Sequence, residues 1–212
     1  MKMNSFGKMF HKEGREKKAE KKEQYTWQQN VALCLHDMIF MLVIVTAVLM
    51  LFLRLIVVDG PSMENTLLNG DYMLLVSNMF YKNPGHGDVV VVSKQAYSNG
   101  KPIVKRVIAT EGQTVDIDFD QGIVYVDGNA LDEPYTKTLT TLQESGSFPQ
   151  VVEQGKVFVM GDNRNNSKDS RSNEIGQVDR REVLGKVIFL MFPGTGMRGT
   201  QQRDFSRIGA VK

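Results

Sequence analysis

A long apolar run between positions 31 and 58 constrains this 212-residue chain more than any other feature. Its interruptions are His36 and Asp37 near the start and Arg54 near the end. The uncharged centre is short for a membrane-crossing helix, but the apolar residues after Arg54 extend it, and Arg54 can reach toward the surface. We therefore predict a transmembrane signal anchor over residues 31–58.

A soluble core helix and a cleavable signal sequence both fit this run less well. The buried helix of a soluble protein would carry polar residues on one face, and the stretch 39–53 offers only Thr46. A cleavable signal sequence would end in small residues, whereas this run continues into Arg54-Leu55-Ile56. An uncleaved anchor is the prediction that remains.

Charge is distributed unevenly on the two sides of the run. Residues 1–30 hold eight Lys and Arg against four Glu, and residues 59–212 hold 17 basic and 19 acidic side chains. The positive-inside bias then predicts a single-pass protein of the cell membrane, with a cytoplasmic tail at 1–30 and an extracytoplasmic domain at 59–212. Nucleic acid is not an expected partner, because the lysines of the tail alternate with glutamates.

The domain after the run reads as mainly β. Short β-branched and apolar stretches are bounded by Gly, Asn and Pro, and they lie at 72–76, 88–92, 103–108, 114–119, 123–126, 156–160 and 183–192. The stretches 89–92 and 187–191 are continuously apolar, which predicts strands buried on both faces. Residues 136–155 read as a loop, and the polar residues from Gly199 onward are expected to be loosely held. Cys34 is the only cysteine, so this domain depends on its core rather than on an internal disulfide.

Ser62 lies in a turn just after the apolar run and is a candidate nucleophile. A serine needs a base, which is usually histidine. His11 and His36 lie before or at the membrane, and His86 is in a glycine-flanked loop, so a Ser-His-Asp triad is poorly supported. A lysine can serve instead if burial lowers its pKa, and Lys105 has apolar neighbours on a predicted strand.

Three segments, in this order, resemble the signature boxes of type I signal peptidases. They are the Asp-Gly-Pro-Ser-Met-Glu-Asn-Thr-Leu of 59–67, the Lys-Arg of 105–106 and the eleven residues of 161–171. The resemblance covers residues 59–192 and is most specific in the third segment. It implies a curled β-sheet catalytic domain preceded by one transmembrane helix.

The resemblance also implies a role for each matching residue. Ser62 corresponds to the nucleophile, Lys105 to the general base, and Ser167 to a hydroxyl that orients the lysine. The oxyanion would be held by the backbone N–H of Ser62. Position 60, where some relatives carry a second hydroxyl donor, is glycine here, as in Gram-positive forms.

Two supporting ion pairs are implied in the same way. Asp169 corresponds to the partner of Arg171 close to the active site, and Arg106 to the partner of Asp162.

The sequence departs from the family pattern at several positions. Asn65 stands where proline is usual, three residues after the serine. Residues that are often glycine, proline and aspartate after the lysine are here Ala109, Glu111 and Gln113. None of these positions transfers a proton, so the departures concern loop geometry rather than chemistry.

The function implied is that of a membrane-bound serine endopeptidase that removes N-terminal signal peptides from exported preproteins. Small residues would occupy the subsites one and three residues before the scissile bond. Expected partners are these signal peptides and the lipid bilayer, with the export machinery as a further candidate. No metal or cofactor is expected, because the sequence has no Cys/His cluster and no Gly-rich phosphate loop.

The sequence leaves two alternatives open. A self-cleaving Ser/Lys regulator would share the two catalytic residues, but residues 1–58 supply a tail and a span in place of a DNA-binding half. A non-enzymatic, membrane-tethered β-domain would carry Ser62 and Lys105 only incidentally. The joint presence of Ser62, Lys105, Ser167 and Asp169 argues against it.

Overall fold

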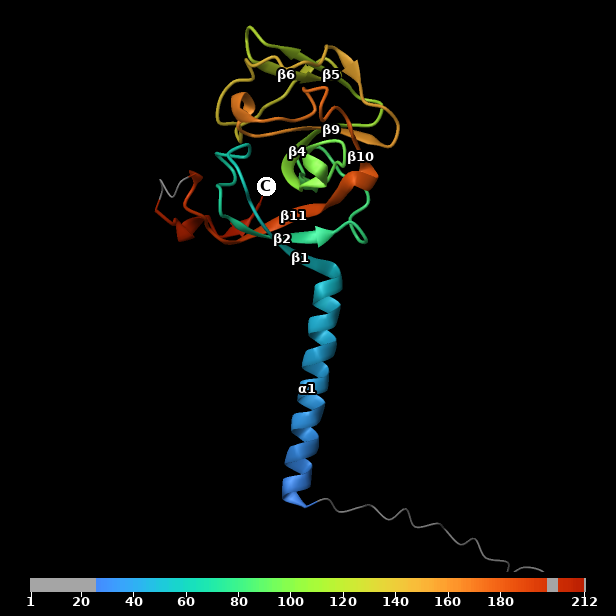
Figure 1. Cartoon of the computed structure of the whole chain (residues 1–212), viewed down its shortest axis with the longest axis vertical. Coiled ribbons are helices and arrows are strands. Elements are labelled where there is room, and N and C mark those ends of the chain that lie inside the picture. Colours follow the sequence, from blue (N-terminus) through green and yellow to red (C-terminus); the bar gives the residue numbers. More distant parts are fainter. Residues whose placement is uncertain (1–25, 198–201, 212) are drawn as a thin grey trace, which may run out of the picture. The chain divides into compact units, whose positions relative to one another are not determined.

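The computed structural model describes residues 26–197 and 202–211, and the chain divides into two units, 1–45 and 46–212. The apolar run forms α1 (Trp27–Phe52), whose 26 residues are all accessible (Figure 1). At 1.5 Å per residue the helix is about 39 Å long, enough to cross a hydrocarbon core of about 30 Å. It is the one helix in the described residues with the length and composition to do so. The basic residues on which the predicted topology rests lie outside the described residues.

The segment 31–58, predicted as the anchor, is helical only in its first part. The helix ends at Phe52, and β1 (Leu53–Val57) follows at once. β1 pairs antiparallel with β2 (Tyr72–Ser77), in a register that sets Leu55 opposite Leu74. An apolar run has no periodicity that separates the end of a helix from a strand, and here the partner strand decided.

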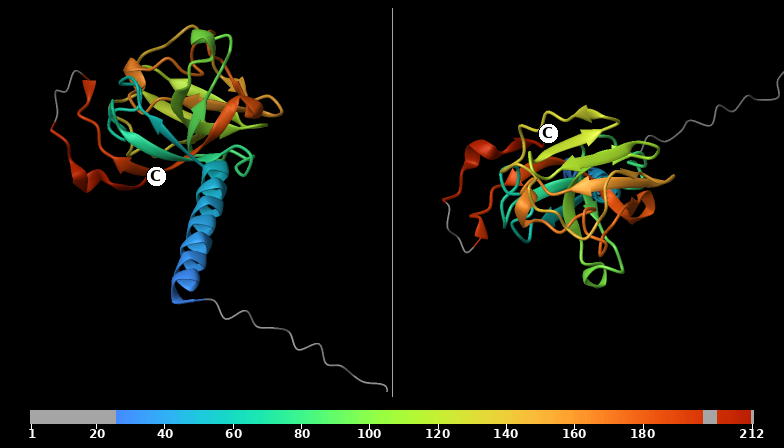
Figure 2. Two further views of the ribbon diagram at one scale, coloured as in Figure 1. Left: turned by 60° about the horizontal axis from the view of Figure 1, so that its bottom comes forward. Right: turned by 90° about the horizontal axis from the view of Figure 1, so that it is seen from above.

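The rest of the described chain is mainly β, as predicted (Figure 2). The larger sheet has eight strands, in the order β1, β2, β11 (Val183–Phe192), β3 (Val89–Val92), β4 (Ile103–Thr110), β9 (Lys156–Met160) and β10 (Val178–Asp179), with β12 (Gly209–Ala210) paired to β11. The smaller sheet has four strands, in the order β7 (Asn129–Ala130), β6 (Ile123–Val126), β5 (Thr114–Asp118) and β8 (Gln150–Val151).

Irregularities along β11 and β4 curl the larger sheet. The register of β11 shifts between Val183 and Gly185 against β3, and twice more against β2, while β4 shifts between Val107 and Ala109 against β9. Such bulges bend a strand and increase its twist. Gly185 permits one of them, because a Cβ there would lie 2.0 Å from the carbonyl oxygen of Val76.

Burial confirms one of the two predicted fully buried strands. All four valines of β3 are buried, but the end of β11 is not, since Phe189 is 37% and Met191 45% exposed. The core lies on one face of β11 there, and the side chains on its other face stay partly exposed, although Phe192 contacts the rings of Tyr72 and Phe205 edge-on. Apolar character alone therefore overestimated the burial of this strand.

The C-terminal segment is also better ordered than predicted. Residues 202–211 are described; β12 pairs with β11, and Arg207 forms an ion pair with the buried carboxylate of Asp71. This contact joins positions that are 136 residues apart. The polar composition of the C-terminal segment gave no sign of this ion pair, because a buried partner that is distant in the sequence leaves no local pattern.

Candidate active site

Ser62 sits in a short turn that is fastened to the core on both sides. The N–H of Glu64 donates to the carbonyl of Pro61 over 3.0 Å, and that of Leu67 donates to Met63 over 2.8 Å. The side chains of Met63 and Leu67 are each 1% exposed, so they anchor the turn in the core. Ser62 itself stays partly accessible. The turn thus presents a hydroxyl at the surface from a fixed backbone.

Lys105 lies on β4, opposite Val90 of β3, and its side chain points toward that hydroxyl. It is only 3% exposed, and its Nζ donates a 2.7 Å hydrogen bond to Ser62 Oγ. The two residues are 43 positions apart in sequence. The structure therefore brings together the two residues that the sequence assigned to proton transfer.

Burial lowers the pKa of Lys105 to about 8. Burial is the largest cause, because it penalises the charged form. The carboxylates of Asp169 and Asp162 oppose it by favouring the ammonium, and Arg171 acts in the same direction as burial. A lysine with this pKa is partly neutral in mildly alkaline solution and can accept a proton from a hydroxyl.

The backbone N–H of Ser62 is available as an oxyanion donor. Within the described part of the chain it donates no hydrogen bond, whereas the carbonyl of the same residue accepts one from the N–H of Asn163 over 3.0 Å. The neighbouring N–H of Gly60 is occupied by the side chain of Asn69 at 2.8 Å. Gly60 therefore contributes neither a hydroxyl nor a free N–H.

The histidine outside the anchor does not complete a triad. The Nδ1 of His86 bonds to the carbonyl of Ile108 over 2.7 Å, and no contact with Ser62 or Lys105 is present among the described residues. This contact directs the ring of His86 to the backbone of β4 rather than to the serine.

Arg106 and Asp162 form the buried pair that the resemblance implied. Arg106 Nε and Nη2 donate to the two carboxylate oxygens over 2.9 and 2.7 Å, and both side chains are 1% exposed. Arg106 also donates to the carbonyl of Gly87 over 2.8 Å, and its guanidinium lies 4.0 Å from the centre of the Tyr135 ring. Thr66 links this pair to the serine turn, since its hydroxyl donates to Asp162 over 2.5 Å.

Asp169 and Arg171 form the second pair. Arg171 Nε and Nη2 donate to the carboxylate over 2.9 Å each, and both side chains are fully buried. Burial alone would raise the pKa of Asp169, but Arg171 and the N–H of Gly161 outweigh it and hold that pKa below its ordinary value. A permanent negative charge therefore lies near Lys105.

Ser167 is placed beside the serine turn, but its contact with the lysine is not present. Its Oγ is buried and has no hydrogen-bond partner among the described residues. A Cβ on Gly161 would fall 2.2 Å from that oxygen and 2.5 Å from the carbonyl oxygen of Ser62. Gly161 is thus required for the close approach of these segments, and the orienting role of Ser167 stays a prediction.

Two supporting pairs escaped the sequence analysis. Arg164 is fully buried and makes a bidentate contact with Glu133 at 2.5 and 2.6 Å. The carboxylate of Asp71 accepts from the N–H of Leu68 at 2.7 Å as well as from Arg207. Arg164 lies inside the third signature segment. An arginine between two asparagines is expected to have a solvent-exposed side chain unless its buried partner is known.

Asn65 marks where this chain departs from the family pattern. Its φ is +100°, which proline cannot adopt because its ring holds φ near −65°. Its side-chain amide donates to the carbonyls of Tyr135 and Thr136 over 3.0 and 3.4 Å. The departure is therefore a different turn, tied to the loop at 135–136.

No group of His, Cys, Asp and Glu suited to a metal is present in the described residues.

A serine hydroxyl bonded to a buried, uncompensated lysine is an arrangement suited to a serine peptidase whose base is lysine. Residues 31–192 match the model of the family described as signal peptidase, peptidase S26. The chain belongs to this family. Its members include the probable signal peptidase I-1 of Synechocystis, 36% identical over 73% of this chain and 81% of the relative.

Two Bacillus proteins are similar to this chain to about the same degree. Signal peptidase I S of Bacillus subtilis is 37% identical over 68% of this chain and 79% of its own length, and signal peptidase I of Bacillus licheniformis is 33% identical over 74% and 89%. A solved signal peptidase I from Enterococcus faecalis is 28% identical, covering 50% of this chain and 97% of that one with a TM-score of 0.41. Family membership excludes a merely tethered binding domain and, with the N-terminal apolar helix, favours a membrane-anchored serine peptidase.

Proposed function

We propose that this protein cleaves N-terminal signal peptides from exported preproteins, with Ser62 as nucleophile and Lys105 as general base. One observation carries the assignment of roles: the 2.7 Å contact from a buried Lys105 Nζ to a partly exposed Ser62 Oγ. The names of the relatives support the choice of substrate.

The reaction follows from these positions. Neutral Lys105 takes the proton of Ser62 as Oγ attacks the carbonyl carbon of the scissile bond, and the N–H of Ser62 stabilises the oxyanion. The tetrahedral intermediate collapses, the protonated lysine gives its proton to the leaving amine, and the mature protein departs. Lys105 then takes a proton from a water molecule as its oxygen attacks the acyl carbon. The bond from that carbon to Ser62 Oγ breaks, Oγ regains a proton from Lys105, and the signal peptide leaves with a free carboxyl group.

The edge of β4 beside Lys105 can hold the signal-peptide side of the substrate. β9 pairs with β4 only from Arg106 onward, so residues 103–105 have a strand partner in β3 alone. An extended peptide added to that edge would pass directly by the reacting pair. The small side chains expected before the scissile bond would then lie beside β4.

The lipid bilayer is a second proposed partner. The register of β1, β2 and β11 places a row of exposed apolar side chains on the sheet face opposite the core: Leu55, Val57, Tyr72, Phe189 and Phe192. This row starts three residues after the end of the apolar helix. Burial of such a face in the lipid interface would remove it from water. A domain that starts at Leu53, and so keeps β1, should bind vesicles, and Phe189→Ser should weaken that binding.

The topology is proposed from the charge distribution along the chain, with residues 1–30 cytoplasmic and 59–212 outside. The exported substrate presents its cleavage site only on the outer side. Protease added to intact spheroplasts should digest the C-terminal domain and leave the Lys-rich tail; a protected C-terminal domain would contradict the proposal.

Cleavage of a purified preprotein in detergent tests the function itself. Ser62→Ala and Lys105→Ala should each abolish cleavage while the fold is kept, and His86→Ala should leave the rate nearly unchanged. More than a few per cent of the wild-type rate in either of the first two variants would refute their roles, and a severe loss in the third would favour a histidine base.

A further inference from the structure

Two exposed ion pairs lie on either side of Ser62 along the segment 59–64. Asp59 contacts Lys101 at 2.6 Å, and Glu64 contacts Lys137 at 2.6 Å. The first pair joins the segment before Ser62 to the residues that lead into β4, where the signal-peptide side of the substrate is proposed to lie. The second pair follows Ser62 in the sequence and joins the serine turn to the loop that carries Lys137.

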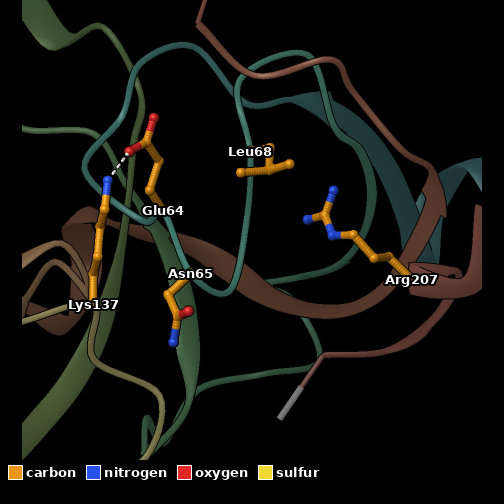
Figure 3. A pocket seen from close by; sticks show the side chains of 5 residues that line it. All are labelled: Glu64, Asn65, Leu68, Lys137 and Arg207. Atoms are coloured by element: carbon orange, nitrogen blue, oxygen red, sulfur yellow. Dashed lines mark hydrogen bonds and ion pairs between the residues drawn. The ribbon is translucent and has the colours of Figure 1, made fainter. Parts of the chain in front are cut away.

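The second pair forms one wall of a pocket of about 310 Å³. Five residues line it: Glu64, Asn65, Leu68, Lys137 and Arg207, and Figure 3 shows Glu64 and Lys137 on one side, with Leu68 and Arg207 on the other. A methyl group would leave most of this volume empty. The pocket is therefore unsuited to the small residues expected before the scissile bond, and suited to the unrestricted residues that follow it.

The pocket adjoins the nucleophile through the backbone. The amide of Asn163 donates to the carbonyl of Pro61 over 3.1 Å and to the Glu64 carboxylate over 3.4 Å. One wall of the pocket thus shares a partner with the residue that precedes Ser62. An extended chain advances about 3.3 Å per residue, so its first three residues after the bond cover about 10 Å.

Positive charge is the accessible charge in this pocket. The side chain of Glu64 is 17% exposed and already engaged, whereas that of Lys137 is 48% exposed and keeps two further N–H donors. Arg207 neutralises the buried Asp71 but is 20% exposed itself, and its Nε donates to no acceptor in the described part of the chain. An acidic side chain would find free donors from both.

We propose that this pocket binds the first residues of the mature protein, after the scissile bond, and that Lys137 makes it favour an acidic side chain within the first three of them. The proposal rests on the proposed function, because it assigns the leaving side of the same substrate. The position of Asn65 in the pocket wall, where the family pattern has proline, gives this chain a pocket of its own shape.

The test uses the full-length enzyme in detergent and preprotein substrates that differ only in having Glu, Gln or Lys at the second position after the bond. For the wild type, kcat/KM should be about five-fold higher with Glu than with Lys, equivalent to about 1 kcal/mol. Lys137→Glu should reverse this ratio. The matched control is Lys101→Glu, which reverses another exposed, ion-paired lysine on the other side of Ser62 and should keep the wild-type ratio.

A binding measurement separates this proposal from the proposed function. Ser62→Ala should bind the corresponding peptides with the same order of affinity, Glu above Gln above Lys, and addition of Lys137→Glu should invert that order. Absence of preprotein cleavage together with this order would refute the function and keep the pocket. Equal affinities and equal rates for Glu and Lys substrates, or an equal shift in the Lys101→Glu control, would overturn the pocket assignment.

Discussion

Lys105 and Arg106 are neighbours on β4, but they point to opposite faces of the strand, and only the charge of Arg106 is compensated by contacts there. Both are buried, at 3% and 1% exposure. Arg106 has a bidentate carboxylate, a backbone carbonyl and an aromatic ring around it, whereas Lys105 has a hydrogen bond to a neutral hydroxyl and no carboxylate in contact among the described residues.

The difference separates a structural cation from the lysine that we propose as the base. A buried cation is tolerated where hydrogen bonds and a counter-charge satisfy it. Without them its pKa falls, and it loses its proton more easily. Full compensation holds the guanidinium in one position, which suits a residue that joins Asp162 and the serine turn. Withholding a contact carboxylate from Lys105 leaves burial as the largest influence on its pKa and lowers that pKa to about 8.

Removal of the Arg106–Asp162 ion pair should have the largest effect on the stability of the protein. Arg106→Met would leave the Asp162 carboxylate buried without its partner, and we expect the free energy of unfolding to fall by about 3–5 kcal/mol. Denaturant unfolding of the purified protein measures it. The double variant Arg106→Met with Asp162→Asn should recover part of the loss; a loss below about 1 kcal/mol in the single variant would mean that the pair is not needed.

The lowered pKa of Lys105 should be visible in the pH dependence of cleavage. With a Lys105 pKa of about 8, the neutral fraction rises about fifty-fold between pH 6 and pH 8, and kcat/KM should rise with it. His86→Ala should show the same profile. A rate that is constant over this range would exclude Lys105 as the base.

Lys105 should also make the fold less stable at neutral pH. Its pKa is lower in the folded protein than the ordinary 10.5, so folding at pH 7 carries the penalty of a buried ammonium. Lys105→Met should be inactive but more stable by about 3 kcal/mol at pH 7, because a pKa lowered from 10.5 to about 8 corresponds to about that free energy. The penalty is full below about pH 8 and disappears as the pH rises toward 10.5, so the two stabilities should converge there. Lys101→Met, at an exposed pair, should show no such convergence.

The smallest expected effect comes from the ring that covers Arg106. Tyr135→Leu removes the cation–π contact and should lower the free energy of unfolding by about 1 kcal/mol. The pH profile of cleavage should not move, because the ring lies on the compensated face. A shift of the apparent pKa in this variant would show that the two faces are coupled.

Much of this site was accessible from sequence because its parts lie in short local segments. The strand stretches were recognisable from β-branched residues between turn residues, and the pairs at Asp169 and Arg106 were implied by a resemblance carried by three segments. The end of α1 was not accessible. Leu53–Val57 is as apolar as the helix before it, and only pairing with β2 made it a strand.

Contacts between distant segments were out of reach. The Arg207–Asp71 pair, the Arg164–Glu133 pair and the pocket beside Glu64 join residues that are polar and ordinary in their own surroundings. Ser167 shows the reverse: its segment was recognised, but the lack of a hydrogen-bond partner for its hydroxyl among the described residues could be seen only in three dimensions.

By itself, the sequence determined the long apolar segment and the mainly β class of the domain, and it singled out Ser62 and Lys105 as the proposed catalytic pair, because composition, alternation and short motifs are local properties of a chain. The tertiary structure decided where the helix ends, which face of β11 is covered, and that Lys105 is buried with a hydroxyl rather than a carboxylate against its ammonium. Burial and charge compensation depend on neighbours brought from tens of residues away. The pKa that makes a lysine a base is therefore a property of the fold.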